Sequence, residues 1–284
     1  METNDQSGEA CPPAFESGEP ALLRELAAAP EDEIFGVVSP SGIGIVRSGG
    51  EELWTLLINL SGWKSKASPF CDQEITIRQK TDKDTAHSIR DRFKAYDVIH
   101  VRARLAIENC FGSPQGLLTG IIVHHRADIE LNEFAIDLQK PVTYNDPQFE
   151  TFTLDRRVNW YESRAKWGSG NVRLCINVDN PKDDLEPLLK TARILWERQQ
   201  HWENVIKDFA VKVLLEIKND NWLEEGELPV TPTAFKQRMT LNSVSIEEGD
   251  HFEFWYDDGD LFWGHSISMS GSLTEGIDAA LIQG

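Results

Sequence analysis

Apolar residues recur at helical spacing from residue 185 to 217, and this is the most regular pattern in the chain. The spacing predicts one long amphipathic helix or two consecutive helices. Asp183 or Asp184 can cap its start, and Pro187 is tolerated in the first turn because an N–H there has no helical partner. The residues that keep the spacing are Leu185, Leu188, Leu189, Ala192, Leu195, Trp196, Trp202, Ile206, Phe209, Ala210, Val213, Leu214 and Ile217.

Residues 34–130 show a different pattern, in which short apolar or alternating runs are separated by proline and glycine. Such runs predict strands with bends between them. Residues 84–94 place Ala86, Ile89 and Phe93 at helical spacing, which predicts a helix before the last two strands. This combination favours a small, partly closed β-barrel of the OB type. The predicted strands cover 34–38, 42–47, 74–78, 98–103 and 116–123, whereas 53–60 fits either a helix or a strand.

The remaining segments complete a two-domain organisation. Residues 1–33 are expected to form an acidic flexible lead with one short helix at 21–29, ALLRELAAA. Residues 131–150 contain two prolines and no sustained period, so we interpret them as a linker. Residues 151–284 then form a C-terminal domain in which the long amphipathic helix packs on an antiparallel sheet. The predicted fold class is therefore α+β, an OB-like barrel followed by an α+β domain.

The sharpest local feature is FEFWYDDGDLFWGHSISM, residues 252–269, in which two apolar runs flank Asp257-Asp258-Gly259-Asp260. An Asp-Gly pair between alternating runs predicts a tight hairpin, because glycine adopts the positive φ that the turn requires. In the simplest interpretation the aspartates are turn residues, Trp255 and Trp263 pack against the fold, and His265 lies in the second strand.

Two functional interpretations of this hairpin stay open. In the first, its tip is a recognition surface, where carboxylates pair with Lys or Arg of a partner and aromatic rings supply rigid contact area. The candidate contact residues are Tyr256, Asp257, Asp258, Asp260 and Trp263, together with Glu247, Glu248 and Asp250. In the second, a divalent cation is held by Asp257, Asp258, Asp260 and His265, although their spacing fits no EF-hand loop.

Arg156 and Arg157 form a second cluster, next to Asp155 and the aromatic residues Trp160 and Tyr161. Two guanidinium groups at this spacing are a candidate clamp for a phosphate or a carboxylate, because each binds such groups through two parallel hydrogen bonds. The alternative is that the arginines pair internally with acidic side chains, and the acidic C-terminal segment is a candidate for that role.

Negative charge is concentrated at the two ends of the chain, whose net charge is −19. Residues 1–33 hold one basic and nine acidic residues, a net charge of −8, and residues 219–284 hold two basic and thirteen acidic residues, a net charge of −11. Such a field attracts a basic protein and repels the phosphates of nucleic acid. The distribution favours a basic partner, and a solvated acidic face without a partner is the other interpretation.

The four cysteines, Cys11, Cys71, Cys110 and Cys175, are widely separated, and none forms a CxxC pair. This usage is typical of reduced, mostly buried thiols in the cytosol rather than of disulfides or a zinc site. The chain shows no secretory leader and no apolar run long enough to span a bilayer. We therefore expect a cytoplasmic protein with no membrane partner.

The sequence contains no G-x-S-x-G, H-E-x-x-H, P-loop or Rossmann fingerprint. His124 and His125 are adjacent, so in a strand they point to opposite faces and cannot be joint ligands. We therefore assign no catalytic residue and expect no cofactor.

Two segments, TFTLDRRVNWYE at 151–162 and YDDGDLFWGHSI at 256–267, together with the helix around Trp202 and the turn at 219–222, resemble a bacterial family called domain of unknown function 2262. The resemblance covers about residues 145–284, and the region before it is similar to the small β-rich domain that often precedes this family. It implies bacterial origin and a cytoplasmic location, and it transfers no catalytic residue.

Two functions from different classes follow from these observations. The first is a non-enzymatic acidic protein-binding module, an immunity or defence-associated protein that neutralises a basic toxin or partner. The second is a metal-assisted hydrolase, in which a cation held by the hairpin aspartates and His265 activates water. A nucleic-acid-binding barrel would require a basic face that the composition does not offer.

Overall fold

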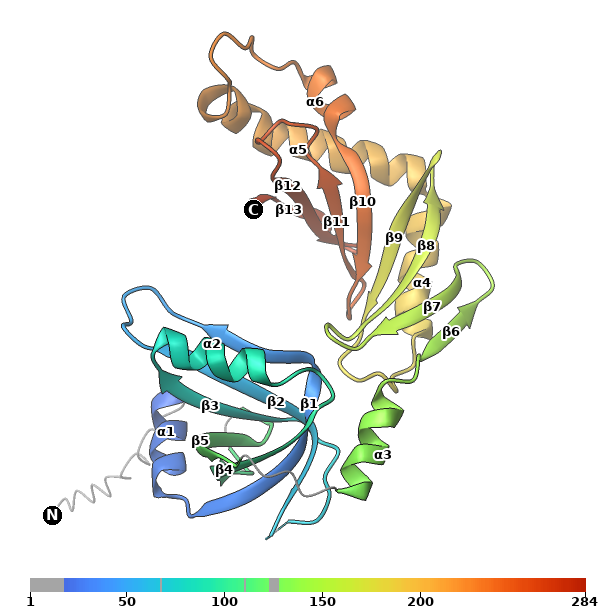
Figure 1. Cartoon of the computed structure of the whole chain (residues 1–284). Coiled ribbons are helices and arrows are strands. Elements are labelled where there is room, and N and C mark those ends of the chain that lie inside the picture. The colour runs from blue at the N-terminus through green and yellow to red at the C-terminus, as the bar shows by residue number, and fades with distance from the viewer. Residues whose placement is uncertain (1–17, 67, 110, 123–127) are drawn as a thin grey trace, which may run out of the picture. The chain divides into compact units, whose positions relative to one another are not determined.

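The computed structural model describes residues 18–66, 68–109, 111–122 and 128–284. These residues form two compact units, unit 1 at Met1–Lys140 and unit 2 at Pro141–Gly284 (Figure 1). Both units combine helices and strands, so the predicted α+β class is confirmed. Four residues discussed above lie outside the described residues: Cys11, Cys110, His124 and His125.

Unit 1 contains a closed barrel of five strands in the order β1-β2-β3-β5-β4. Its interior is filled by alternate strand residues such as Ile34, Leu56, Ile77 and Val101, all of them fully buried. The barrel has the predicted OB-like character, with a helix between the third and fourth strands. Its elements are α1 (Glu19–Ala28), β1 (Glu31–Val46), β2 (Trp54–Ser65), β3 (Ile75–Thr81), α2 (Lys83–Arg92), β4 (Val98–Ala106), β5 (Gln115–Ile121) and α3 (Ile129–Leu138).

Strand β1 differs from the prediction, because the two strands expected at 34–38 and 42–47 are one continuous strand. Its pairing with β2 shifts register on both sides of Val38. Such irregularities accommodate Pro40, which has no N–H for the ladder, and Gly42, whose φ is 75°. Proline and glycine therefore bend the strand here without ending it.

The predicted linker at 131–150 is largely regular structure. Asp128 caps the start of helix α3, because its carboxylate accepts the N–H of Leu131, and Leu131 and Ala135 pack against Val37 of the barrel. The boundary between the units, after Lys140, lies inside the predicted linker. A ten-residue helix such as α3 depends on tertiary packing, and its own periodicity is too short to predict it.

Unit 2 is built on an eight-stranded sheet in the order β13-β12-β11-β10-β9-β8-β7-β6. The described strands pair antiparallel except for β9 and β10, which run parallel. The strands are β6 (Thr143–Asp146), β7 (Glu150–Asp155), β8 (Trp160–Trp167), β9 (Gly170–Asn177), β10 (Thr240–Ile246), β11 (His251–Asp257), β12 (Ser266–Ser272) and β13 (Gly276–Gln283).

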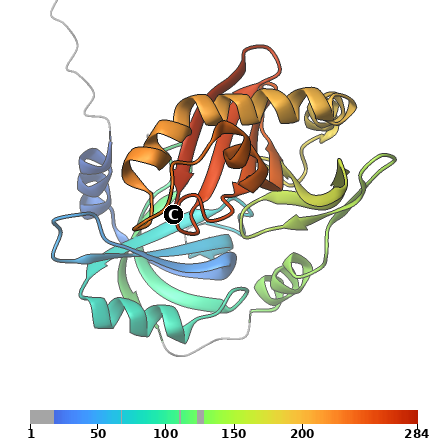
Figure 2. The ribbon, with the colours of Figure 1, turned by 90° about the horizontal axis from the view of Figure 1, so that it is seen from above.

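The predicted helical segment forms two helices, α4 (Glu186–Glu197) and α5 (Gln199–Asn221), with Pro187 in the first turn of α4. Together with α6 (Pro232–Arg238) they make the crossover that the parallel pair requires. Figures 1 and 2 show α5 lying along the sheet, and the helices share one buried core with it. Among the described residues, no helix has both the length and the apolar character needed to cross a membrane.

Gly271 in β12 lies at a register shift where only a residue without Cβ fits. A Cβ added there would lie 2.2 Å from the carbonyl oxygen of Gly276, which is backbone and cannot rotate away. We expect Gly271→Ala to lower the free energy of unfolding by about 1–3 kcal/mol, as other overpacked substitutions do. Urea denaturation of the full chain measures this effect. Gly170→Ala is the control, because its Cβ would meet only one atom, at 3.8 Å, and equal losses in both variants would contradict the argument.

Candidate functional site

The loop between β11 and β12 is longer than the predicted tight turn. Asp257 at the end of β11 pairs with Ser266 at the start of β12, so the connection spans residues 258–265. Asp260 and Trp263 have positive φ, of 69° and 56°, which lets the chain reverse more than once within the loop. We call residues 258–265 the tip loop.

Asp258 organises the tip loop from within, since it is only 4 % exposed. The backbone N–H groups of Asp260, Phe262 and Gly264 donate to its carboxylate at 3.0, 2.6 and 3.3 Å. A side chain that bonds several backbone groups in this way fixes the local turn. The structure therefore assigns Asp258 to the loop itself rather than to a partner or a cation.

Further contacts fix the tip loop from outside. The Arg238 guanidinium donates to the carbonyl oxygens of Gly259 and Asp260. The His265 Nδ1 donates to the carbonyl oxygen of Phe262 at 2.6 Å, since a carbonyl only accepts. The Phe262 side chain is fully buried. The loop is thus held at both ends and in its middle.

Trp263 is the large apolar side chain that the tip loop leaves in solvent, with 54 % of its surface exposed. Its ring centroid lies 4.7 Å from that of Trp222, and Trp222 meets Phe262 and His265 edge to face. A bulky residue at positive φ is strained, and such conformations persist only where the surroundings enforce them. Trp263 thus packs against Trp222 on one side, as its interpretation as a packing residue expects, and leaves the rest of its surface in solvent.

Trp222 supports Trp263, and it is a site residue that the sequence reasoning did not assign. The Lys218 ammonium donates a hydrogen bond to the Trp222 carbonyl oxygen at 2.8 Å. The same ammonium donates to the Glu227 carboxylate at 2.9 Å. Lys218 is only 1 % exposed, so the contact fixes the end of α5 from inside. A buried lysine on a helix cannot be recognised from spacing alone, because lysine is normally exposed.

Asp257 and Asp260 keep exposed side chains at the tip loop, as a recognition surface requires. Tyr256 does not, because it is 1 % exposed and its hydroxyl has no hydrogen-bond partner among the described residues. Burial raises its pKa well above the ordinary value, and the nearby charge of Glu203 adds to this effect. Tyr256 is thus a core residue, and its predicted contact role is wrong.

The structure does not bring the candidate cation ligands together. Within the described ranges, no group of three His, Cys, Asp or Glu side chains is arranged to hold a metal ion. The Asp258 carboxylate is occupied by backbone N–H groups, and the His265 Nδ1 is occupied by a carbonyl oxygen. The metal-assisted hydrolase therefore has no ligand set in this geometry.

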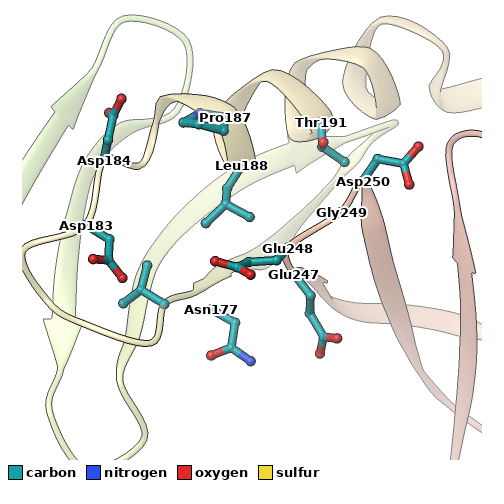
Figure 3. A pocket seen from close by; sticks show the side chains of 11 residues that line it. Asn177, Asp183, Asp184, Pro187, Leu188, Thr191, Glu247, Glu248, Gly249 and Asp250 are labelled. Atoms are coloured by element: carbon teal, nitrogen blue, oxygen red, sulfur yellow. The ribbon is translucent and has the colours of Figure 1, made fainter.

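The other acidic candidates lie at the opposite end of β11 from the tip loop; they are Glu247, Glu248 and Asp250. The residues predicted to form one recognition surface therefore lie in two separate places. The seven residues of β11 separate them by about 20 Å, at roughly 3.3 Å per residue. The three residues line a pocket of about 430 Å³ together with Asp183 and Asp184, which precede α4 (Figure 3). We call it the acidic pocket.

The arginine cluster is organised by a local ion pair. The Arg157 guanidinium donates to Asp155 two residues away, with its Nε at 3.0 Å from one carboxylate oxygen. Internal pairing, one of the two interpretations, therefore describes Arg157, although its partner is not in the C-terminal segment. Arg156 lies near Tyr161. Burial raises the pKa of the Tyr161 hydroxyl, and the positive charge of Arg156 lowers it by a smaller amount.

Cys175 and Cys71 are free thiols. Cys175 is buried in β9, and burial raises its pKa to about 11, with a smaller contribution from Glu162. A thiol with a raised pKa is not ionised at neutral pH and is a poor nucleophile. Cys175 is therefore a small core residue, as the cysteine pattern predicts.

These features define an acidic two-unit protein, an OB-like barrel joined to an α+β unit with an exposed aromatic loop and an acidic pocket. The family model described as "Uncharacterized protein conserved in bacteria (DUF2262)" matches residues 146–282, and one described as "Domain of unknown function (DUF7021)" matches residues 21–138. The match to the DUF2262 model over residues 146–282 confirms the resemblance of the C-terminal half of the chain to this family. No curated protein and no solved structure matches the chain.

Proposed function

We propose that unit 2 is a non-enzymatic binding module for a basic protein, with Trp263 as its central contact. The observation that carries the proposal is the exposed indole on a loop that Asp258 and Arg238 hold in one conformation. Tryptophan is enriched among the residues that dominate binding energy. A contact that is already ordered before binding also loses less entropy when the complex forms.

Charge supports a basic partner. Asp257 and Asp260 precede Trp263 in the chain and are exposed, and residues 219–284 carry a net charge of −11. Complementary fields of this kind accelerate association and select among partners. In this proposal the protein acts in the bacterial cytoplasm, where its scattered cysteines stay reduced, and it neutralises a basic toxin or comparable partner by covering its surface.

Trp263→Ala is the direct test. We expect a basic protein from the native source to bind the immobilised full chain at low salt and to elute at high salt. Removing the indole is expected to weaken this binding by about 2 kcal/mol or more, roughly thirtyfold, as at other tryptophan anchors. Because Trp263 is half exposed, the free energy of unfolding of the variant should lie within about 0.5 kcal/mol of the wild-type value. Titration calorimetry with the eluted protein measures the affinity.

Asp278→Asn is the matched control, since Asp278 is exposed on β13 outside the tip loop. It is expected to keep the affinity, whereas Asp260→Asn is expected to slow association at low salt only. If no basic protein binds, or if the captured protein binds Trp263→Ala as tightly as the wild type, the proposed function is wrong.

A further inference from the structure

Strand β13 forms one end of the eight-stranded sheet of unit 2 (Figure 1). It pairs with β12 and with no other described strand. A strand carries hydrogen-bonding groups on both of its sides, so the N–H and C=O groups of β13 that face away from β12 have no strand partner. Such an edge is a template on which another extended chain can pair.

Proteins usually protect such edges by short length, proline or charge, and the opposite edge of this sheet is protected in this way. Its edge strand, β6, has only four residues, and prolines lie on both sides of it, at Pro141 and Pro147. Strand β13 has eight residues and contains neither proline nor lysine. The two edges of one sheet therefore differ, and the β13 edge lacks the protection of the β6 edge.

The single charged residue of β13 does not protect the outer edge. Asp278 lies at the register shift between β12 and β13, and its carboxylate accepts the Ser270 hydroxyl of β12 at 3.0 Å. From Ala279 to Gln283 the strand keeps a regular register with β12 and carries no charged side chain. Leu281, within this stretch, is 53 % exposed. We call residues 279–283 the open edge, which is roughly 16 Å long at 3.3 Å per residue.

Charge favours a basic segment over a second copy of this chain as the occupant of the open edge. Residues 239–284, which contain β10 to β13 and the loops between them, hold nine acidic residues and no Lys or Arg. Two copies paired through β13 would bring these acidic segments together, and each chain carries a net charge of −19. An extended segment with Lys or Arg side chains is attracted to the same surface.

The open edge also continues into the tip loop. Gly284, the residue after β13, lies against the His265 ring, with which an added Cβ would clash. The His265 ring contacts Trp222 edge to face, and the Trp222 ring contacts that of Trp263. The carboxyl end of β13 and Trp263 thus belong to one continuous surface.

We propose that the open edge binds an extended basic segment of a partner protein as a ninth strand of the sheet. Backbone hydrogen bonds to residues 279–283 supply affinity, as in other complexes formed by strand addition. Lys or Arg side chains of the segment pair with the surrounding acidic surface. This inference rests on the proposed function, because it gives the basic partner of that proposal a mode of binding beside Trp263.

The test titrates the isotope-labelled full chain with a peptide of eight alternating lysine and valine residues, acetylated and amidated, and follows backbone amides by NMR. We expect saturable shifts in β13 and at least about tenfold slower hydrogen exchange at the outward-facing amides of residues 279–283. The same peptide N-methylated at every residue keeps the charge but donates no backbone hydrogen bond, and it should bind at least about tenfold more weakly. Equal binding of the two peptides, binding of neither, or protection outside β13 only would overturn the inference.

A matched pair of variants separates the open edge from general charge repulsion. Leu281→Lys places on the edge the kind of charge that protects natural edges, and it should weaken peptide binding at least about tenfold. Leu228→Lys makes the same change at a residue that is 82 % exposed, between α5 and α6, and should bind like the wild type. Equal weakening by both variants would contradict a site on β13.

Trp263→Ala distinguishes a failure of this inference from a failure of the proposed function. Peptide binding that Leu281→Lys abolishes and Trp263→Ala leaves intact would support the open edge and contradict the central role of Trp263. Binding that Trp263→Ala abolishes and Leu281→Lys leaves intact would overturn the open edge and keep the proposed function. Sedimentation velocity of the full chain tests the other occupant, since a dimer that Leu281→Lys dissociates would assign the edge to a second copy and overturn the inference.

Discussion

Asp258→Ala is expected to lower the free energy of unfolding of the protein by about 3 kcal/mol. The substitution removes a carboxylate that accepts three backbone N–H groups, the shortest bond being 2.6 Å from Phe262. Hydrogen bonds to charged groups contribute about 1.5–3 kcal/mol each, and a buried N–H left without a partner adds a penalty. Urea denaturation of the full chain, followed by tryptophan fluorescence, measures the loss.

The same substitution should also release Trp263, because Asp258 fixes the positive φ values of the tip loop. We expect the variant to lose the binding proposed for Trp263 even under conditions where it remains folded. Asp257→Ala is the matched control, since its carboxylate is exposed and makes only a long bond of 3.4 Å to Asn242. Asp257→Ala should lower the free energy of unfolding by no more than about 0.5 kcal/mol. Similar losses for both aspartates would show that Asp258 does not organise the loop.

The sequence predicts best those elements whose pattern repeats over several turns. The segment 185–217 repeats its apolar positions often enough to define α4 and α5. Strand β13, with the sequence GIDAALIQ, was not predicted, because its apolar and polar residues do not alternate. Its place at the sheet edge comes from pairing with β12, which local sequence does not encode.

The candidate site could be predicted only in part, and its residues show why. Tyr256 is in phase with Phe252 and Phe254, so strict alternation alone would have placed it in the core. The exposure of Trp263 depends on the φ values of an irregular loop, which no periodicity encodes. Asn177 and Glu247 are far apart in sequence, and they become neighbours only because β9 and β10 run parallel. The acidic pocket was therefore not visible in the sequence, although three of its residues were candidates.

Arg193→Met is expected to destabilise unit 2 by about 3 kcal/mol at neutral pH. The Arg193 guanidinium bonds Asp146 at 2.5 Å and Glu186 at 2.6 Å, which ties α4 to β6. The Asp146 side chain is only 1 % exposed, so the substitution leaves its carboxylate buried without a countercharge. Removing one partner of a buried pair typically costs about 3–5 kcal/mol. The double variant Arg193→Met/Asp146→Asn should recover part of the loss, since it removes the unpaired charge as well.

The pH dependence of this loss distinguishes a buried charge from lost packing. Burial alone raises the pKa of Asp146, but the N–H groups of Phe149 and Gln148 and the Arg193 guanidinium together hold it below the ordinary value. In the wild type this group therefore stabilises the fold above about pH 4, and the contribution is lost as the pH falls through the lowered pKa. Without Arg193 the pKa of Asp146 rises, so protonation relieves the buried charge at a higher pH. The difference in unfolding free energy between Arg193→Met and the wild type should thus shrink from pH 7 toward about pH 4. A difference that stays constant over this range would mean that Arg193 acts through packing of its side chain and not through its charge.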